Sequence, residues 1–267
     1  MIGELPVGVW LFPAAPADRL VAAIVRAEEL GLDEVWVADE GVAREPVAVL
    51  AVAARETTRI RLAVGITTPL LRHPGALAAS ASTVDELSGG RFVLGLGVGG
   101  DKSLAPFGIE PTRPVVRLAD AITTARAVLS GRPAEGYLPP DHAAPPRQVP
   151  IWVGARGPRL LELATSAADG IFVSGCSQEQ HDRASAVRRS AMVGESAVGL
   201  ALYQSAGRPA RPGVVDWDDV GPVLSGEAAR MGDPPPTSLG INLVDLLDPG
   251  TDPVAAVERA AVALGRG

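Results

Sequence analysis

Short runs of consecutive apolar residues alternate along the chain with longer segments in which apolar residues recur every three or four positions. The first pattern is typical of strands buried on both faces, and the second of helices packed by one face. Strands are predicted over residues 7–12, 34–38, 60–66, 91–96, 150–153, 169–173, 197–203 and 238–243. Helices are predicted over residues 18–30, 46–56, 75–87, 115–129, 159–168, 178–192, 218–231 and 253–264.

Strands that alternate with helices predict a parallel sheet covered by helices. Eight such units within 267 residues predict an α/β fold of the (β/α)8 TIM barrel type, as a single domain over residues 1–267. An open doubly wound sheet is the alternative. The barrel is preferred because the strand count is eight and no shift in composition divides the chain. Residues 132–149 are interpreted as an ordered excursion, and the region between strands seven and eight as short and rich in proline.

In a parallel barrel the ligand lies across the carboxyl ends of the strands. The sequence places the following residues at or near these strand ends: residues 10–13 for the first strand, Asp39 and Glu40 for the second, Gly65, Ile66, Thr67 and Thr68 for the third, Gly97, Val98 and Gly99 for the fourth, Gly154, Ala155, Arg156, Gly157 and Pro158 for the fifth, Ser174 and Gly175 for the sixth, and Gln204 for the seventh. Neighbouring residues on a strand point to opposite faces. At most one of the two adjacent carboxylates is therefore expected to face the site.

Three glycines after the fourth strand, Gly95, Gly97 and Gly100, match the G-x-G-x-x-G spacing of dinucleotide-binding turns. That interpretation requires a helix directly after the third glycine. The prolines at 106, 111 and 114 argue against such a helix. The glycines then either let a ligand approach the backbone closely or form a turn that binds nothing.

Side chains that carry out catalysis by themselves are few. There is no Ser-His-Asp arrangement and no HExxH motif, and of the three histidines, His142 and His181 are expected on the surface while His73 could line the site. Cys176 is the only cysteine, so neither an intramolecular disulfide nor a cysteine-based metal site is expected, and no metal is predicted. A site built from backbone and small residues suits a large flat cofactor with its own chemistry. Arg156, at the start of a predicted helix, could hold its phosphate.

The net charge of −7 and the lack of a basic stripe argue against nucleic acid as a partner. No apolar run reaches 18 residues, and the amino terminus lacks the features of a signal peptide. We therefore expect a cytoplasmic protein that does not bind membranes and acts on a small molecule.

Residues 87–99, LSGGRFVLGLGVG, resemble the signature of the bacterial luciferase-like monooxygenase superfamily, and of its deazaflavin-dependent oxidoreductase branch in particular. Supporting matches lie at residues 35–39, 61–67, 72–74, 150–154 and 168–170. Together they cover roughly residues 5 to 175 in the right order. The combination is specific, although each piece alone is weak.

The resemblance implies a barrel that binds coenzyme F420 or FMN across the strand ends and transfers a hydride between the cofactor ring and a substrate. It implies a cis peptide bond between Gly65 and Ile66 and a bulge that supports the back of the ring. Gly97 to Gly99 would run beside the ring, and residues 154–158 would hold the phosphate. Asp39 would bond to the ring or substrate, and Glu40 or His73 would handle a proton. A homodimer is implied by resemblance alone.

Two departures from the family pattern leave questions open. Many deazaflavin-dependent members have histidine where this chain has Glu40, so the proton donor is undecided. The family often has a helical insertion between strands seven and eight, where this chain is short, so the substrate lid is undecided as well. An FMN-dependent monooxygenase is the alternative within the same fold. A non-catalytic flavin-binding barrel is the alternative of another class.

Overall fold

The fold is described from a computed structural model that covers residues 5–134, 136–174, 178–190, 197–204, 214–215, 217–231, 236–243, 246, 248 and 250–267. Its strands are β1 (Val7–Leu11), β2 (Glu34–Val37), β3 (Arg61–Thr67), β4 (Phe92–Leu96), β5 (Ile151–Gly154), β6 (Gly170–Ser174), β7 (Ala197–Gln204), β8 (Val214–Val215) and β9 (Ser238–Leu243). Its helices are α1 (Ala17–Glu29), α2 (Pro46–Glu56), α3 (Pro74–Ser88), α4 (Asp101–Leu104), η1 (Ala105–Phe107), α5 (Pro114–Ser130), α6 (Pro158–Ala167), α7 (Gln178–Ser190), η2 (Trp217–Asp219), α8 (Val220–Met231) and α9 (Pro253–Ala263).

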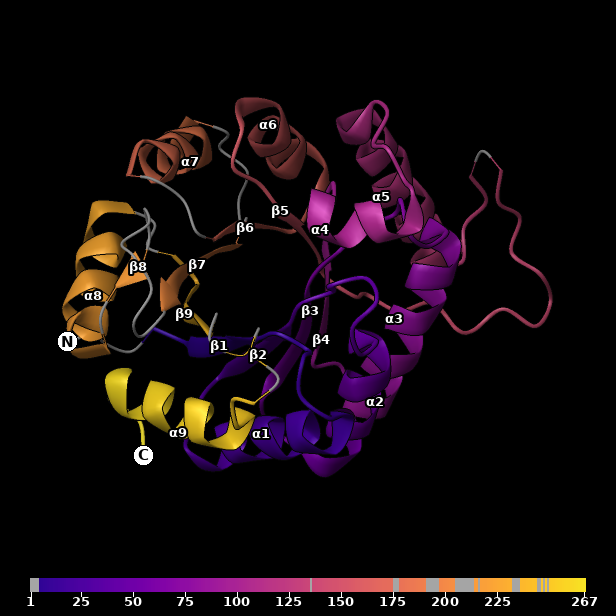
Figure 1. The fold of residues 1–267 in the computed structure, drawn as a ribbon. Coiled ribbons are helices and arrows are strands. Elements are labelled where there is room, and N and C mark those ends of the chain that lie inside the picture. The colour runs from indigo at the N-terminus through magenta and orange to yellow at the C-terminus, as the bar shows by residue number, and fades with distance from the viewer. Residues whose placement is uncertain are drawn as a thin grey trace.

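The chain has a parallel α/β fold with a strongly curled sheet. The strands follow the order β6-β5-β4-β3-β2-β1-β9-β7-β8, and β6 pairs in addition with β7. The pairings of β1 to β7 and β9 therefore lead back to the strand where they begin. Figure 1 shows the strands in the centre of the molecule and the larger helices arranged around them. This arrangement brings the carboxyl ends of the strands together at one end of the sheet.

Helix boundaries follow from local chemistry. Proline occupies the first position of α2, α3, α5, α6 and α9, where a missing backbone N–H breaks no helical hydrogen bond. Helix α3 ends at Gly89, whose φ of 70° suits glycine better than any other residue. These residues therefore favour the observed starts of five helices and the observed end of α3.

Aromatic side chains fill the space enclosed by the curled sheet. Trp36 on β2 stacks on Trp10 of β1 at a ring separation of 5.0 Å and on Phe172 of β6 at 5.1 Å. Trp152 on β5 approaches Trp36 to 5.2 Å. We call these four residues the aromatic cluster. All four are buried, so four of the ten aromatic residues of this chain meet at its centre.

The predicted elements agree with the observed ones in order and type, with bounds that differ by at most two residues where the structure describes them. One prediction was wrong. Helix α4 begins directly after Gly100, which the prolines were expected to prevent. It has only four residues and ends before Pro106, so the prolines limit its length and not its start. The two-residue strand β8 was not predicted, because two residues carry no periodic pattern.

The excursion between α5 and β5 projects from the body of the molecule as an arm (Figure 1). An isolated bridge joins Ala134 and Tyr137. At its base, Arg147 donates from Nε to Asp85 Oδ2 of α3 at 2.8 Å. In the part of the chain that is described, no helix is long and apolar enough to cross a membrane.

Candidate active site

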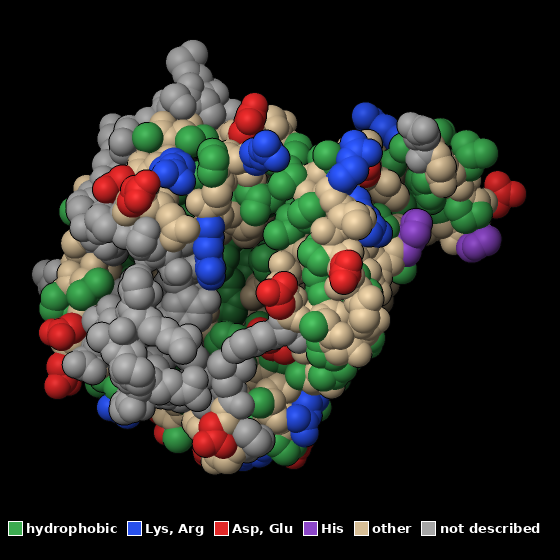
Figure 2. Space-filling view, turned by 45° about the horizontal axis from the view of Figure 1, so that its top comes forward, with side chains coloured by type: hydrophobic (Ala, Val, Ile, Leu, Met, Phe, Trp, Pro, Cys, Tyr) green, Lys and Arg blue, Asp and Glu red, His purple; other side chains and the backbone are tan. Residues whose placement is uncertain are grey.

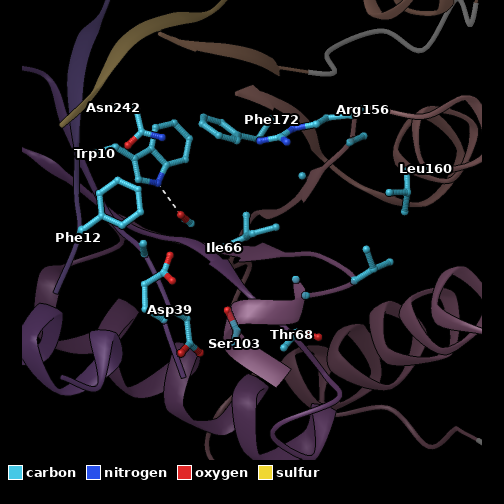
Figure 3. Close-up of a pocket in the computed structure, with 18 of the residues that line it drawn as sticks. Trp10, Phe12, Asp39, Ile66, Thr68, Ser103, Arg156, Leu160, Phe172 and Asn242 are labelled. Atoms are coloured by element: carbon cyan, nitrogen blue, oxygen red, sulfur yellow. Dashed lines mark hydrogen bonds between the residues drawn. The ribbon is translucent and has the colours of Figure 1, made fainter. Parts of the chain in front are cut away.

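A cavity of about 630 Å³ opens at the carboxyl ends of the strands. This volume lies within the usual range for small-molecule sites. Figure 2 shows the hollow in the molecular surface, and Figure 3 shows the residues around it. The lining residues are Trp10, Phe12, Ala38, Asp39, Glu40, Gly65, Ile66, Thr68, Val98, Gly99, Gly100, Asp101, Ser103, Gly154, Ala155, Arg156, Leu160, Phe172 and Asn242.

The end of β3 forms the central wall of this cavity. The peptide bond between Gly65 and Ile66 is cis, and the register of β3 against β4 shifts between Val64 and Thr67. Trp10 donates a hydrogen bond from Nε1 to the carbonyl oxygen of Gly65. A Cβ atom on Gly65 would lie only 2.5 Å from Trp10 Nε1, so glycine is required here. The cis bond and the irregularity that the resemblance implied are both present.

Asp39 lies beside this wall, and neighbouring protein groups hold its carboxylate in place. Oδ2 accepts a hydrogen bond from Thr67 Oγ1 at 2.6 Å and lies 3.3 Å from Arg72 Nη2. Oδ1 accepts from the backbone N–H of Gly41 at 3.1 Å. Arg72 also pairs with Glu45, the residue that caps α2. The network joins the end of β2, the end of β3 and the start of α2, so it fixes one side of the cavity.

Both adjacent carboxylates line the cavity, which contradicts the expectation that at most one would do so. Strand β2 ends at Val37. Asp39 and Glu40 therefore lie beyond the strand, where the alternation of faces no longer applies. Asp39 is buried, and Glu40 is half-buried.

The exit of β5 forms the opposite side of the cavity. Gly154, Ala155 and Arg156 line it, while Gly157 and Pro158 lie just behind as the cap and first residue of α6. The cap of α6 is Gly157, which has no side chain to accept from the first N–H groups of the helix. Such a helix start, together with a guanidinium, can bind a phosphate. Figure 3 shows Arg156 and Asp39 on opposite sides of the cavity.

Several predicted site residues lie elsewhere. His73 is exposed, is absent from the lining, and caps α3 by accepting at Nδ1 from the backbone N–H of Gly75 at 3.1 Å. Thr67 is buried and does not line the cavity. Its hydroxyl donates a hydrogen bond to Asp39. Gly97 lies behind Ile66, while Val98 and Gly99 do line the cavity.

Four further residues singled out in the sequence lie outside the described part of the structure or on its surface. Ser174 ends β6, but its side chain lies outside the described part, as do Cys176 and the side chain of His181. His142 is exposed, as expected. Among the described residues, no group of histidine, cysteine and acidic side chains could hold a metal ion.

Four residues that the sequence reasoning missed contribute polar or aromatic groups to the cavity. Phe172 belongs to the aromatic cluster, and Asp101 and Ser103 come from α4. Asn242 lies one position before the end of β9 and is buried. Applying the strand-end rule to the eighth predicted strand would have found Asn242. Nothing in the sequence signals that Phe172 faces inward, because its strand is apolar on both faces.

The profile of the luciferase-like monooxygenase family matches residues 5–206. Two similar relatives are 5,10-methylenetetrahydromethanopterin reductases. The one from Methanolobus tindarius is 32% identical over 173 residues, which make up 62% of this chain and 53% of the relative. The one from Archaeoglobus fulgidus is 32% identical over 173 residues, with shares of 62% and 52%. The chain thus spans about half the length of these curated relatives.

Solved structures with the same fold are named for different cofactors. The coenzyme F420 dependent tetrahydromethanopterin reductase from Methanopyrus kandleri has a TM-score of 0.77 at 20% identity, covering 97% of this chain and 98% of that one. A type II Baeyer-Villiger monooxygenase of Pseudomonas putida in complex with FMN has a TM-score of 0.76 at 13% identity, with coverage of 97% and 98%. These likenesses concern the fold. The match of the family profile over most of the sequence shows that the chain belongs to the luciferase-like monooxygenase family.

Proposed function

We propose that this protein is an oxidoreductase that transfers a hydride between coenzyme F420 and a small organic substrate. In this proposal residues 1–267 form one (β/α)8 barrel domain. The observation that carries the proposal is the cavity at the carboxyl ends of the strands, which is lined by the buried carboxylate of Asp39 on one side and by Gly154, Ala155 and Arg156 on the other. The similarity to methylenetetrahydromethanopterin reductases and the fold shared with an F420 dependent reductase support it.

The residues present fit a flat cofactor with a phosphate. Gly154 and Ala155 line the cavity, and Arg156 together with the first N–H groups of α6 would hold the phosphate. Ile66, Trp10 and Phe172 offer apolar surface for a ring. Bound there, the coenzyme would supply the ring that carries the hydride.

The protein's own groups would position the reactants and handle protons. Thr67 and Arg72 hold Asp39 in one orientation at the cavity wall, which suits a fixed acceptor for a ring or substrate N–H or O–H. Glu40 also lines the cavity and is our candidate for the proton-handling group. Glu40 is preferred to His73 as the proton-handling group, because His73 is exposed and caps α3. The buried aromatic cluster closes the floor of the site to water.

A specific observation keeps FMN as a second candidate. Arg156 is the only arginine or lysine side chain among the described residues that line the cavity. One guanidinium matches the single phosphate of FMN, whereas the tail of coenzyme F420 carries a phosphodiester and several carboxylates. In that case the protein would be a flavin-dependent monooxygenase, as the family name suggests.

Calorimetric titration of the purified protein with coenzyme F420 and with FMN tests the proposal. We expect F420 to bind with a micromolar dissociation constant and reduced F420 to be oxidised by at least one carbonyl or imine compound in a broad panel. Binding of FMN alone would select the monooxygenase. If neither cofactor binds, the proposed function is wrong, and binding without turnover would favour a non-catalytic cofactor carrier. Sedimentation of the same sample tests the homodimer.

A further inference from the structure

Ile66 follows the cis bond and lines the cavity, and its side chain is pressed against two neighbouring strands. Figure 3 shows it near the centre of the lining residues. Gly97 directly follows β4, and Gly154 ends β5. These two strands pair through Leu96 and Val153, so the two glycines are the next positions along the same register. The end of the Ile66 side chain lies over both of them.

The fit between Ile66 and the glycines leaves no room for a methyl group. A Cβ atom on Gly97 would lie 2.0 Å from Ile66 Cδ1, and one on Gly154 would lie 2.6 Å from the same atom. Ordinary van der Waals contact begins at 3.4 Å. An alanine at either position would therefore push Cδ1 away from the strands by close to an ångström or more.

Gly95 provides a contrast within the same stretch of sequence. A Cβ atom there would lie 2.1 Å from the backbone carbonyl oxygen of Val64, which can move only if β3 itself moves. At Gly97 and Gly154 the obstacle is the end of a side chain that can rotate. Substitution of Gly95 should damage the fold, whereas substitution of Gly97 or Gly154 should mainly reposition Ile66.

We propose that Gly97 and Gly154 are positioning residues that determine which ligands the cavity accepts, because together they form a slot that holds Ile66 back against the strands. This inference rests on the proposed function for the identity of the ligand. The side chain of Ile66 is half-buried, and its open side is the cavity. A methyl group in the slot would turn Cδ1 into the space that a planar ring needs.

The test compares Gly97→Ala and Gly154→Ala with the parent protein and with Gly226→Ala as the matched control. Gly226 is exposed on α8, and a Cβ atom there meets no atom within 4 Å. Dissociation constants for F420 and FMN are measured by calorimetry, and melting temperatures by calorimetric scanning. We expect both slot variants to bind the parent's cofactor about tenfold more weakly or worse while they melt within a few degrees of the parent. Gly226→Ala should match the parent in both measurements.

Ile66→Val removes only the atom that occupies the slot, so it separates this mechanism from a general loss of structure. In an Ile66→Val background, Gly97→Ala and Gly154→Ala should cause less than a twofold further loss of affinity. The proposal is overturned if the slot variants bind as well as the parent, or if they lose affinity equally in both backgrounds.

A measurement without cofactor keeps this inference distinct from the proposed function. In a methyl NMR spectrum of protein labelled at isoleucine δ1, the Ile66 resonance is assigned by its absence in Ile66→Val. It should shift in Gly97→Ala and Gly154→Ala and stay in place in Gly226→Ala. If the parent binds neither cofactor, the proposed function fails, and this spectrum alone decides whether the slot holds Ile66. An unmoved resonance in the slot variants would contradict the slot.

Discussion

The two ends of β2 carry two buried carboxylates in different surroundings. At the carboxyl end, Asp39 receives hydrogen bonds from Thr67 and Gly41 and lies beside Arg72. At the amino end, Glu34 is 3% exposed, and its Oε2 lies 3.5 Å from Arg61 Nη1 without a hydrogen bond in the described part of the chain.

Burial raises the pKa of Glu34 above its ordinary value. The hydroxyl of Ser238, the charge of Arg61 and the indole N–H of Trp36 oppose that effect and do not outweigh it. The protein thus holds one carboxylate in place at the functional end of the strand and leaves the other poorly compensated at the opposite end. Four substitutions test this contrast.

Asp39→Ala should have the largest effect. It leaves the Thr67 hydroxyl and the Gly41 N–H without their acceptor and removes one partner of Arg72. We expect a loss of about 2–3 kcal/mol in the free energy of unfolding, measured in urea, together with loss of cofactor binding. Asp39→Asn keeps the shape of the side chain, so it should lose less stability and less cofactor affinity than Asp39→Ala. Unchanged stability in Asp39→Ala would mean that the carboxylate does not hold the cavity wall.

Arg72→Gln should have the next largest effect, because Arg72 joins Asp39 to Glu45 at the start of α2. Its side chain is 28% exposed, so its ion pairs are partly screened by water. We expect a loss of about 1 kcal/mol in stability and weaker cofactor binding. If a high salt concentration abolishes the difference in stability between Arg72→Gln and the parent, the contribution of Arg72 is purely electrostatic. A difference in stability that remains at high salt measures the hydrogen bonds of Arg72.

Glu34→Gln should stabilise the protein, and by an amount that depends on pH. Because the pKa of Glu34 is raised in the folded state, the folded protein binds more protons than the unfolded chain above pH 4.5, the ordinary pKa. Stability therefore falls as pH rises from there through the raised pKa. The Glu34→Gln variant, which has no such proton to lose, should gain stability over the parent at pH 8 and little at pH 4. Equal differences at both pH values would show that Glu34 is not perturbed.

Arg61→Gln should have the smallest effect. Arg61 is 46% exposed at the side chain and approaches Glu34 only to 3.5 Å. We expect a loss of less than about 1 kcal/mol at pH 8, and none at pH 4, where Glu34 is protonated. A larger loss for Arg61→Gln than for Arg72→Gln would reverse the contrast between the two ends of β2.

Elements that depend on local pattern could be predicted from the sequence. Apolar runs gave the strands, and prolines and glycines gave the helix ends, so the cavity was expected at the right end of the sheet. The cis bond at Ile66 followed from resemblance and not from the residues themselves.

The features of the site that the sequence did not predict depend on contacts between distant residues. Gly97 was expected beside a ligand, but it accommodates a side chain that lies 31 positions earlier in the chain. Asp39 and Glu40 were expected to point to opposite faces as they would on a strand, whereas β2 ends at Val37, and Thr67 and Arg72 set the orientation of Asp39. Such packing has no one-dimensional signature, because it is set by how the strands are placed side by side.

The aromatic cluster also gives this protein an optical signal of its own. Three of the four tryptophans, Trp10, Trp36 and Trp152, lie within one group of contacting rings below the cavity. The fourth, Trp217, lies apart from the group, under the guanidinium of Arg259 at 4.6 Å. Rings this close couple their electronic transitions, so folding should produce a strong near-ultraviolet circular dichroism band. A flavin-type ring bound above them would take up their excitation energy, so the emission of these three tryptophans should fall when the cofactor binds.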